Sequence, residues 1–115
     1  MKIAISSTGS SLDHTVHPLF GRCDFFLLVD TDTDAVLPIK NEFCDAATGA
    51  GTGGAQKVIH QGVEAVISGQ IGPKAYEALK AAGVALYSAP AGITVREALA
   101  RFNAGSLQKI EIKRF

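Results

Sequence analysis

The sequence has little of what marks secreted, membrane-bound or nucleic-acid-binding proteins. Its 115 residues include only two cysteines and no tryptophan. Two cysteines are too few for the disulfide framework of a small secreted domain, so they are expected to be free thiols, metal ligands or buried apolar residues. The 11 basic and 11 acidic residues cancel, and a basic excess is the usual signal for nucleic acid or an anionic membrane. Neither partner is predicted.

Long apolar runs are also absent. No stretch approaches the length of a membrane span, and the apolar start at residues 2–5 is too short for the core of a signal peptide. A cytoplasmic protein is therefore predicted. Hydrophobic residues nevertheless make up 47% of the chain, which at this length suffices to bury a core without disulfides or a structural metal. We expect a single domain over residues 1–115.

Strand and helix patterns alternate along the chain, which predicts an α/β fold. Pro38 cannot donate to a sheet and so places the third strand, joined to the second by a polar turn, at an edge. Thr94 and Glu97 have the spacing of a helix capping box. Strands are predicted at 2–7, 24–30, 35–43, 63–67 and 84–87, and helices from about 54 to 62, from 73 to 83 and from 94 onward. The tail from 106 to 115 fits either an added strand or a frayed end.

Chain direction predicts where the glycine-rich loops meet. Strands that all return in one direction place the loops 6–23, 44–54, 68–72 and 88–92 at the carboxyl edge of the sheet. Ligands of open α/β sheets bind at that edge. The predicted helix N-termini, at Gly54, Pro73 and Thr94, point there too and offer unpaired N–H groups to an anion. The sequence therefore predicts an anion-accepting crevice, with the acidic hairpin turn at the opposite end.

The first loop carries the residues with the most distinctive chemistry. An imidazole, a guanidinium and a thiol, those of His17, Arg22 and Cys23, fall within seven positions. Together with Cys44, and with His14 in second place, they form a set of soft and borderline ligands that suits a sulfur-rich metal cluster. Helix N-termini and a guanidinium would also stabilise a cluster of negative charge. Two or three ligands fit transient carriage of a prebuilt cluster better than a permanent four-ligand site.

Other motifs are weaker. The run Gly49–Gly54 matches the dinucleotide fingerprint G-x-G-x-x-G, but the acidic residue expected after the next strand is absent, and Ala55 stands where a phosphate loop has lysine. The acidic turn lacks the glycine and glutamate of a calcium loop. Ser11, Asp13 and His14 are the residue types of a hydrolytic triad, but they crowd a single loop. Nucleotide, calcium and hydrolase functions are therefore disfavoured.

The chain resembles the dinitrogenase iron-molybdenum cofactor biosynthesis family, the small carrier proteins and domains of the NifX and NafY type. The residues that carry the resemblance are Lys2–Ile5, Phe20-Gly21-Arg22-Cys23 with Phe26, Gly49–Gly54, Gly62-Val63, Gly69–Pro73, and Gly92 with Thr94–Leu99. The resemblance implies a three-layer α/β/α ribonuclease-H-like fold. Its sheet would be mixed and five-stranded, in the order 3-2-1-4-5, with strand 2 antiparallel.

The resemblance also implies a cargo and a set of site residues. Family members typically carry a histidine directly before the Phe-Gly pair, whereas this chain has Leu19 there and His17 nearby. The form His-Pro-x-Phe-Gly-Arg resembles the orange-protein branch, which holds a molybdenum-copper sulfide cluster without covalent bonds to the protein. The implied cofactor-binding residues are His17, Phe20, Gly21, Arg22, Gly49, Gly51, Gly53, Gly69 and Gly72, and the metal ligands are Cys23, His17 and Cys44.

Three functions are open at the level of sequence. The first is a non-catalytic carrier of an iron- or molybdenum-containing sulfide cluster, either the iron-molybdenum cofactor or a precursor, or a molybdenum-copper sulfide cluster. A cofactor-donor or acceptor protein would be its partner. The second is a small-anion or metabolite sensor that uses the same crevice. The third, ranked last, is a thiol-dependent enzyme built on Cys23.

Overall fold

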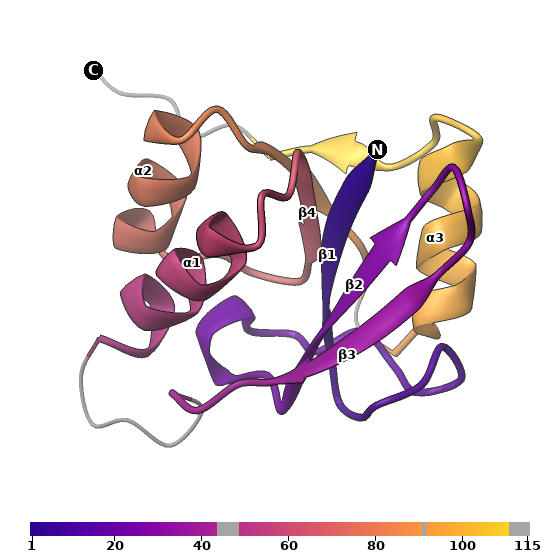
Figure 1. Ribbon diagram of the computed structural model, residues 1–115, viewed down its shortest axis with the longest axis horizontal. Helices are drawn as coiled ribbons and strands as arrows, with labels where there is room; N and C mark the ends of the chain where they lie inside the picture. The colour runs from indigo at the N-terminus through magenta and orange to yellow at the C-terminus, as the bar shows by residue number, and fades with distance from the viewer. Residues whose placement is uncertain (44–48, 91, 111–115) are drawn as a thin grey trace.

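The fold is a mixed β-sheet between two layers of helices. The computed structural model describes residues 1–43, 49–90 and 92–110. α1 and α2 cover one face of the sheet, and α3 covers the other (Figure 1). The elements are β1 Lys2–Ser7, the 3-10 turn η1 Phe20–Arg22, β2 Phe25–Asp30, β3 Val36–Lys40, α1 Ala50–His60, β4 Ala65–Ser68, α2 Pro73–Ala81, β5 Ala85–Ser88, α3 Val95–Asn103 and β6 Gln108–Lys109.

The strand order is β3-β2-β1-β4-β5-β6. β2 runs antiparallel to β1 and β3, whereas β1, β4 and β5 are parallel. The predicted order of five strands and the antiparallel second strand are therefore confirmed. The sheet has one strand more than predicted, because β6 pairs antiparallel with β5, with Tyr87 opposite Lys109. Within the described part of the tail, residues 106–110, the structure has the added strand.

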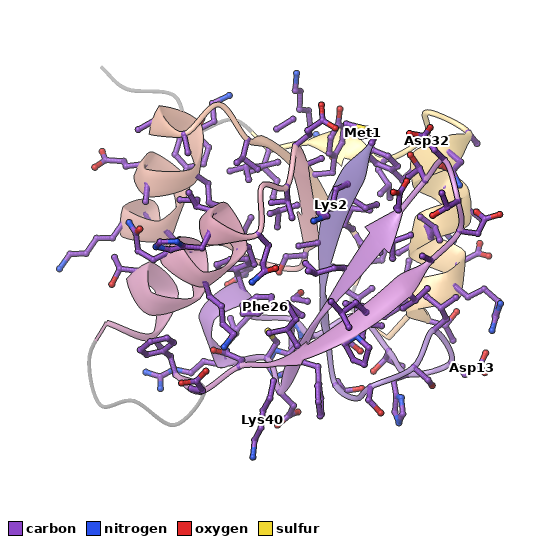
Figure 2. The ribbon with its side chains drawn as sticks, in the orientation of Figure 1. Met1, Lys2, Asp13, Phe26, Asp32 and Lys40 are labelled. Carbon is purple, nitrogen blue, oxygen red and sulfur yellow. The ribbon has the colours of Figure 1, made fainter. Side chains whose placement is uncertain are left out.

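Strand alternation divides the core into two clusters, one on each face of the sheet. In β1, Ile3 and Ile5 face α3, and Ala4 between them faces α1 and α2. In β2, Phe26 and Leu28 share the face of Ala4. Figure 2 shows Phe26 at the end of the sheet from which Lys40 projects. The side chains on these faces are buried, as the apolar runs of β1 and β2 predict.

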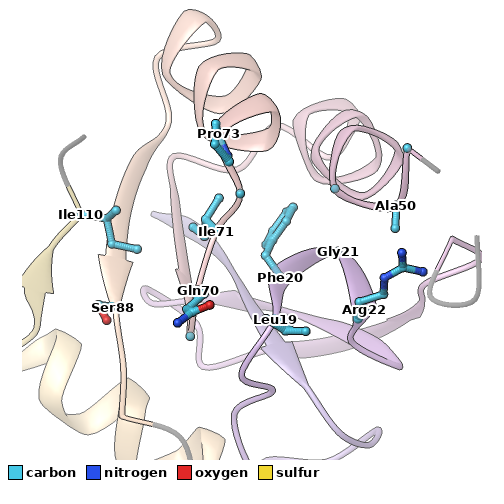
Figure 3. A pocket seen from close by; sticks show the side chains of 14 residues that line it. Leu19, Phe20, Gly21, Arg22, Ala50, Gln70, Ile71, Pro73, Ser88 and Ile110 are labelled. Carbon is cyan, nitrogen blue, oxygen red and sulfur yellow. The ribbon is translucent and has the colours of Figure 1, made fainter. Parts of the chain in front are cut away.

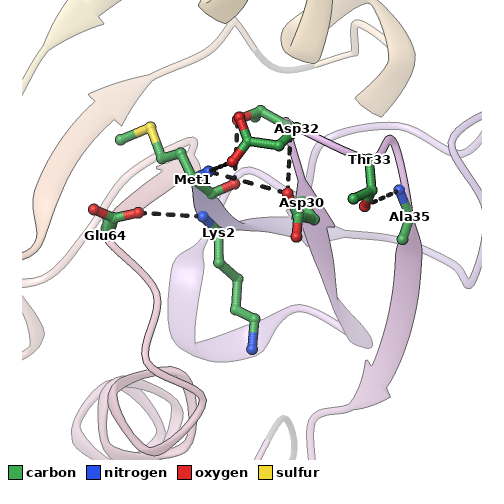
Figure 4. Close-up of polar contacts among 8 residues, drawn as sticks. Met1, Lys2, Asp30, Asp32, Thr33, Ala35 and Glu64 are labelled. Carbon is green, nitrogen blue, oxygen red and sulfur yellow. Dashed lines mark hydrogen bonds and ion pairs between the residues drawn. The ribbon is translucent and has the colours of Figure 1, made fainter.

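The acidic hairpin turn lies at the other end of the sheet. The Met1 amine donates to Asp32 Oδ2 at 2.7 Å and lies 4.0 Å from Asp30 Oδ1, and the Lys2 N–H donates to Glu64 (Figure 4). The hydrogen bond to Asp32 raises the pKa of the Met1 amine. Asp34 takes a left-handed conformation, with φ of 61°, at the tight turn into β3. These contacts link the N-terminus to the hairpin turn at the end of the sheet opposite the carboxyl edge of the parallel strands.

α1 begins earlier than predicted. Residues 50–54 form its first turns instead of a loop, with Gly49 at the N-cap at a φ of 77°. Aromatic packing explains why glycines are helical here: a Cβ on Gly54 would lie 3.0 Å from Phe26 Cζ, and one on Gly53 would lie 2.6 Å from the Phe43 ring. The missing side chains let these rings lie against the helix, and this packing outweighs the low helix propensity of glycine.

Within the described part of the chain, no helix has both the length and the apolar character needed to span a bilayer.

Candidate functional site

A crevice of about 720 Å³ opens at the carboxyl edge of the sheet (Figure 3). Its walls come from η1, the first turns of α1 and α2, the loop after β4, the end of β5 and the residue after β6. The lining residues are Leu19, Phe20, Gly21, Arg22, Gly49, Ala50, Gly51, Gly69, Gln70, Ile71, Gly72, Pro73, Ser88 and Ile110. The structure thus joins segments far apart in sequence at the predicted edge.

Backbone hydrogen bonds hold the η1 segment against the loop after β4. The Gln70 N–H donates to Pro18 O at 2.6 Å, and the Phe20 N–H donates to Gln70 O at 2.9 Å. The Phe20 side chain is buried, and its ring centroid lies 5.1 Å from that of Phe26. Phe20 therefore anchors one wall of the crevice in the core.

Two glycines allow this close packing. A Cβ on Gly21 would lie 2.6 Å from the Gly51 nitrogen, and one on Gly69 would lie 2.4 Å from the Pro18 oxygen. Both clashes are with backbone, which cannot rotate away. The glycines are needed for close approach between chain segments, since neither has a positive φ.

Gly21→Ala is expected to destabilise the fold, and Gly72→Ala is its matched control. Overpacking against rigid backbone costs about 1–3 kcal/mol. A Cβ on Gly72 meets nothing within 4 Å, and its φ of −66° suits alanine. The control should therefore change the free energy of unfolding by less than about 1 kcal/mol. Denaturant unfolding measures both variants, and equal stabilities would contradict the tight contact between η1 and α1.

The polar part of the crevice combines a guanidinium with the N-termini of two helices. The exposed Arg22 side chain lies beside the start of α1 (Figure 3). The N-cap glycines of α1 and α2, Gly49 and Gly72, make no side-chain cap. First-turn N–H groups lack intrahelical acceptors and carry partial positive charge. This side of the crevice is therefore suited to an anion.

The prediction that α3 would also point into the crevice is not met. Its Val95 N–H donates to His14 O at 2.8 Å, and its Arg96 N–H donates to Leu12 O at 2.9 Å. Thr94 Oγ1 accepts from the Glu97 N–H at 3.1 Å, as the capping-box pattern predicts. The loop before β2 thus satisfies this helix end on the other side of the sheet, and α1 and α2 are left as the helices that begin at the crevice.

The remaining walls are mainly apolar. Leu19, Ile71 and Ile110 contribute aliphatic side chains, and Gln70 and Ser88 add polar groups (Figure 3). Ile110 follows β6, and its N–H donates to Leu86 O at 2.8 Å. The sequence analysis did not select these five residues. Ile110 belongs to the C-terminal tail, which the sequence analysis left open between an added strand and a frayed end.

The two candidate histidines make local contacts. His17 Nδ1 accepts from the Leu19 N–H at 3.0 Å, and His14 Nδ1 lies 3.0 Å from Ser11 Oγ and accepts from the Ser11 N–H at 3.2 Å. These bonds occupy one ring nitrogen of each histidine and stabilise the conformation of the loop between β1 and η1. Among the described residues, neither histidine belongs to the set that lines the crevice.

Cys23, which the sequence analysis selected as a metal ligand in the first loop, is in the core. Its side chain is fully buried in the cluster beneath α1 and α2. Burial raises the pKa of its thiol from 9.0 to about 12. A cysteine that acts as a metal ligand or nucleophile must be ionised and accessible to its partner. The Cys23 thiol is neither at neutral pH. The structure therefore does not favour a thiol-dependent enzyme built on Cys23.

Cys23 should behave as a masked thiol. In a Cys44→Ala background, its reaction with a thiol reagent at pH 8 is expected to be about 100-fold slower in native protein than in denatured protein, because the buried group stays protonated. The thiol ionises more easily in the unfolded state than in the folded state. The contribution of the buried Cys23 thiol to the free energy of unfolding is therefore complete below about pH 9 and is lost as the pH rises toward about 12.

A Cys23→Ala variant in the same background provides the comparison for the pH dependence. Compared with the Cys44→Ala protein, this variant should have a smaller free energy of unfolding at neutral pH and should lose less of it between pH 9 and pH 12. Parallel stability profiles, or rapid modification of the native thiol, would contradict the burial of Cys23.

The structure gathers most of the predicted cofactor-binding residues in the crevice. Gly53 is an exception, since it lies within α1 beside Phe43. His17 and Cys23 are placed as described above, and Cys44 lies outside the described residues. The predicted residues that line the crevice are Phe20, Gly21, Arg22, Gly49, Gly51, Gly69 and Gly72. No group of three or more His, Cys, Asp or Glu side chains suited to a metal ion occurs among residues 1–43, 49–90 and 92–110.

Proteins of known sequence or structure are similar to this chain over most of its length. An uncharacterized protein of Methanocaldococcus jannaschii is 33% identical over an alignment of 114 residues, and the match covers 96% of this chain and 92% of that protein. The apo form of the orange protein from Desulfovibrio gigas is 36% identical, with a TM-score of 0.90 and coverage of 95% of this chain and 92% of that one.

A Thermotoga protein that has been proposed to be a NifB protein is 34% identical, with a TM-score of 0.84 and coverage of 98% of this chain and 97% of that one. The family described as dinitrogenase iron-molybdenum cofactor matches residues 1–105. The match spans η1, the starts of α1 and α2, and every crevice residue except Ile110. The chain therefore belongs to the dinitrogenase iron-molybdenum cofactor family.

Proposed function

We propose that this protein is a non-catalytic carrier that binds a preformed, anionic metal-sulfide cluster in the crevice. The cargo is the iron-molybdenum cofactor or a precursor, or a molybdenum-copper sulfide cluster. The observation that carries the proposal is the convergence of Arg22 with the first turns of α1 and α2 around one cavity. A cofactor donor or acceptor protein would be the exchange partner.

The crevice has the two kinds of surface that such a cluster needs. Sulfide is a soft anion that accepts weak hydrogen bonds and packs against apolar carbon. Arg22 and the helix N-termini supply positive charge, and Leu19, Ile71 and Ile110 supply the apolar walls. A hydrogen bond to a charged group contributes about 1.5–3 kcal/mol, and a helix N-terminus contributes about 0.3–1 kcal/mol to binding an anion. Micromolar affinity corresponds to about 8 kcal/mol, so these polar contacts supply only part of the binding free energy.

The exposure of the walls suits loading and release. Leu19 is 44% exposed, and Arg22 is also exposed, although both line the crevice. A cargo held there can be reached by a second protein. Binding through hydrogen bonds and charge also allows transfer without breaking a covalent metal-protein bond.

The crevice volume favours a cluster over a simple oxyanion. About 720 Å³ lies within the range of small-molecule sites. An oxyanion of a few water volumes, each about 30 Å³, would fill only a small part of it. The family match and the likeness to the orange protein support the same choice. A small-anion sensor remains the alternative, because the same N–H groups would donate hydrogen bonds to such an anion.

Anaerobic loading tests the proposal. The protein is incubated with tetrathiomolybdate and copper(I), and separately with iron, sulfide and molybdate, and is then desalted. A cluster carrier is expected to retain colour and metal in a fixed ratio to protein. Molybdate and phosphate, followed by calorimetry, test the small-anion alternative. Loss of all metal on desalting, together with tight binding of either oxyanion, would contradict the carrier proposal.

A further inference from the structure

Asn41 is a buried polar residue that lies behind the crevice wall. It follows β3 directly, and its side chain is fully buried. Its Nδ2 donates to Gly21 O at 3.0 Å and to Cys23 O at 2.9 Å, and lies 3.8 Å from Cys23 Sγ. Both N–H bonds of one carboxamide are therefore used to hold backbone carbonyls of the segment that carries Arg22.

These two carbonyls lie on either side of Arg22. The Gly21 carbonyl belongs to the peptide before Arg22, and the Cys23 carbonyl belongs to the second peptide after it. The Arg22 N–H donates to Leu19 O at 3.3 Å, a longer bond than either of those from Asn41. Asn41 thus provides the shorter restraints on the backbone from which the guanidinium extends into the crevice.

The same side chain also connects this segment to α1. Asn41 Oδ1 accepts from the Phe43 N–H at 3.1 Å. The Phe43 ring lies against Gly53, since a Cβ there would approach it to 2.6 Å. On the other side, the Gly21 backbone lies against the Gly51 backbone. One buried amide therefore bonds to η1 and to the residue that packs on α1. These two elements, η1 and α1, form neighbouring walls of the crevice.

We propose that Asn41 is a positioning residue for cargo binding, which fixes the backbone of Arg22 relative to the first turn of α1. The inference rests on the carrier function proposed above. It predicts that Asn41 contributes to affinity through Arg22, without touching the cargo. An amide that only satisfied buried carbonyls would stabilise the fold and leave the contribution of Arg22 unchanged.

A double-mutant cycle separates these two roles. The variants are Asn41→Asp, which keeps the side-chain shape but replaces the donor group, and Asn41→Ser, which is too short to reach both carbonyls. Each is combined with Arg22→Ala. The destabilised control is Val29→Ala, a cavity in the core beneath α3 on the other face of the sheet. Circular dichroism and thermal unfolding establish that each variant is folded at the titration temperature.

Binding of the tetrathiomolybdate-copper cluster is then titrated anaerobically. Arg22→Ala should weaken binding about tenfold in the wild-type and Val29→Ala backgrounds, and less than about threefold in either Asn41 background, because coupled residues are not additive. Each Asn41 variant alone should also lose about tenfold and should alter the visible circular dichroism of the bound cluster, which reports its surroundings.

The outcomes separate the two proposals. If wild-type protein retains no metal from either loading mixture, the carrier function fails. If wild type binds but Arg22→Ala costs the same in every background, the carrier function stands and the positioning role of Asn41 is wrong. Failure of both Asn41 variants to fold would also overturn the inference, because Asn41 would then serve the whole fold and not the site.

Discussion

Replacing Arg22 by alanine is expected to weaken cluster binding by about tenfold or more. Arg22 is the arginine that lines the crevice, and it lies beside the α1 N-terminus. A hydrogen bond that involves a charged partner contributes about 1.5–3 kcal/mol, and about 1.4 kcal/mol corresponds to a tenfold change in affinity. Arg22→Lys should recover only part of the loss, since lysine keeps the charge but lacks the planar fork of donors.

Salt dependence and a charge-matched variant make this prediction specific. Raising the ionic strength from 0.1 M to 1 M shortens the Debye length from about 10 Å to about 3 Å, so wild-type binding should weaken and the gap to Arg22→Ala should narrow. Arg96→Ala removes the same charge from α3, where Arg96 pairs with Asp13 at 3.1 Å. It should bind like wild type. Equal losses for Arg22→Ala and Arg96→Ala would show that only net charge matters.

Gly51→Val is expected to abolish binding at every salt concentration. Gly51 lines the crevice within the first turn of α1, and a Cβ there would lie 3.4 Å from Ala75 Cβ. That distance is an ordinary contact, so one methyl group fits, but the two further methyl groups of valine extend into the space between α1 and α2. The effect is steric, so salt should not change it.

Gly51→Ala is the matched control for this variant. It adds the same Cβ without the branch, and alanine favours a helix, so folding should be unimpaired and most of the affinity retained. Isothermal titration measures both variants after thermal unfolding has shown that they are folded. If Gly51→Val binds as well as Gly51→Ala, the cargo does not occupy the space between the two helices.

The strand order was predicted from the resemblance to the family, and the local sequence rules agreed with it where they applied. Pro38 placed β3 at the edge, and the unbroken apolar run of β2 required cover on both faces. β6 was left open because its two residues, Gln108 and Lys109, carry no apolar alternation. Pairing with β5 determines its conformation, and this long-range contact has no local signal.

The start of α1 could not be predicted from propensity. Five residues with three glycines, from Ala50 to Gly54, favour a loop when considered alone. The rings of Phe20, Phe26 and Phe43 come from other segments and need surfaces without side chains. Gly21 and Gly69 line the crevice, as the sequence analysis expected of cofactor-binding residues. The structure gives a different reason for their being glycine: they let two backbone segments approach closely, and they do not form a flexible loop.

Two site residues show a further limit of sequence reasoning. Cys23 was selected for its thiol, but its position one residue after η1 turns the side chain into the core, where it is protonated. Asn41 was not selected, because it fell inside the edge strand predicted at 35–43 and no local pattern marks it as functional. Its importance comes from the two carbonyls that it reaches, 18 and 20 residues earlier in the chain.

The most direct test of the account is to map the cargo on the protein by NMR. Backbone amide resonances of isotopically labelled protein are followed during anaerobic titration with the tetrathiomolybdate-copper cluster. Shifts should concentrate at η1, at residues 49–52 and at residues 69–75, and the amides of α3 should stay unchanged. Shifts centred on α3 or on the acidic turn around Asp32, or saturable binding without any change at the crevice, would contradict the claim that this crevice holds the cluster.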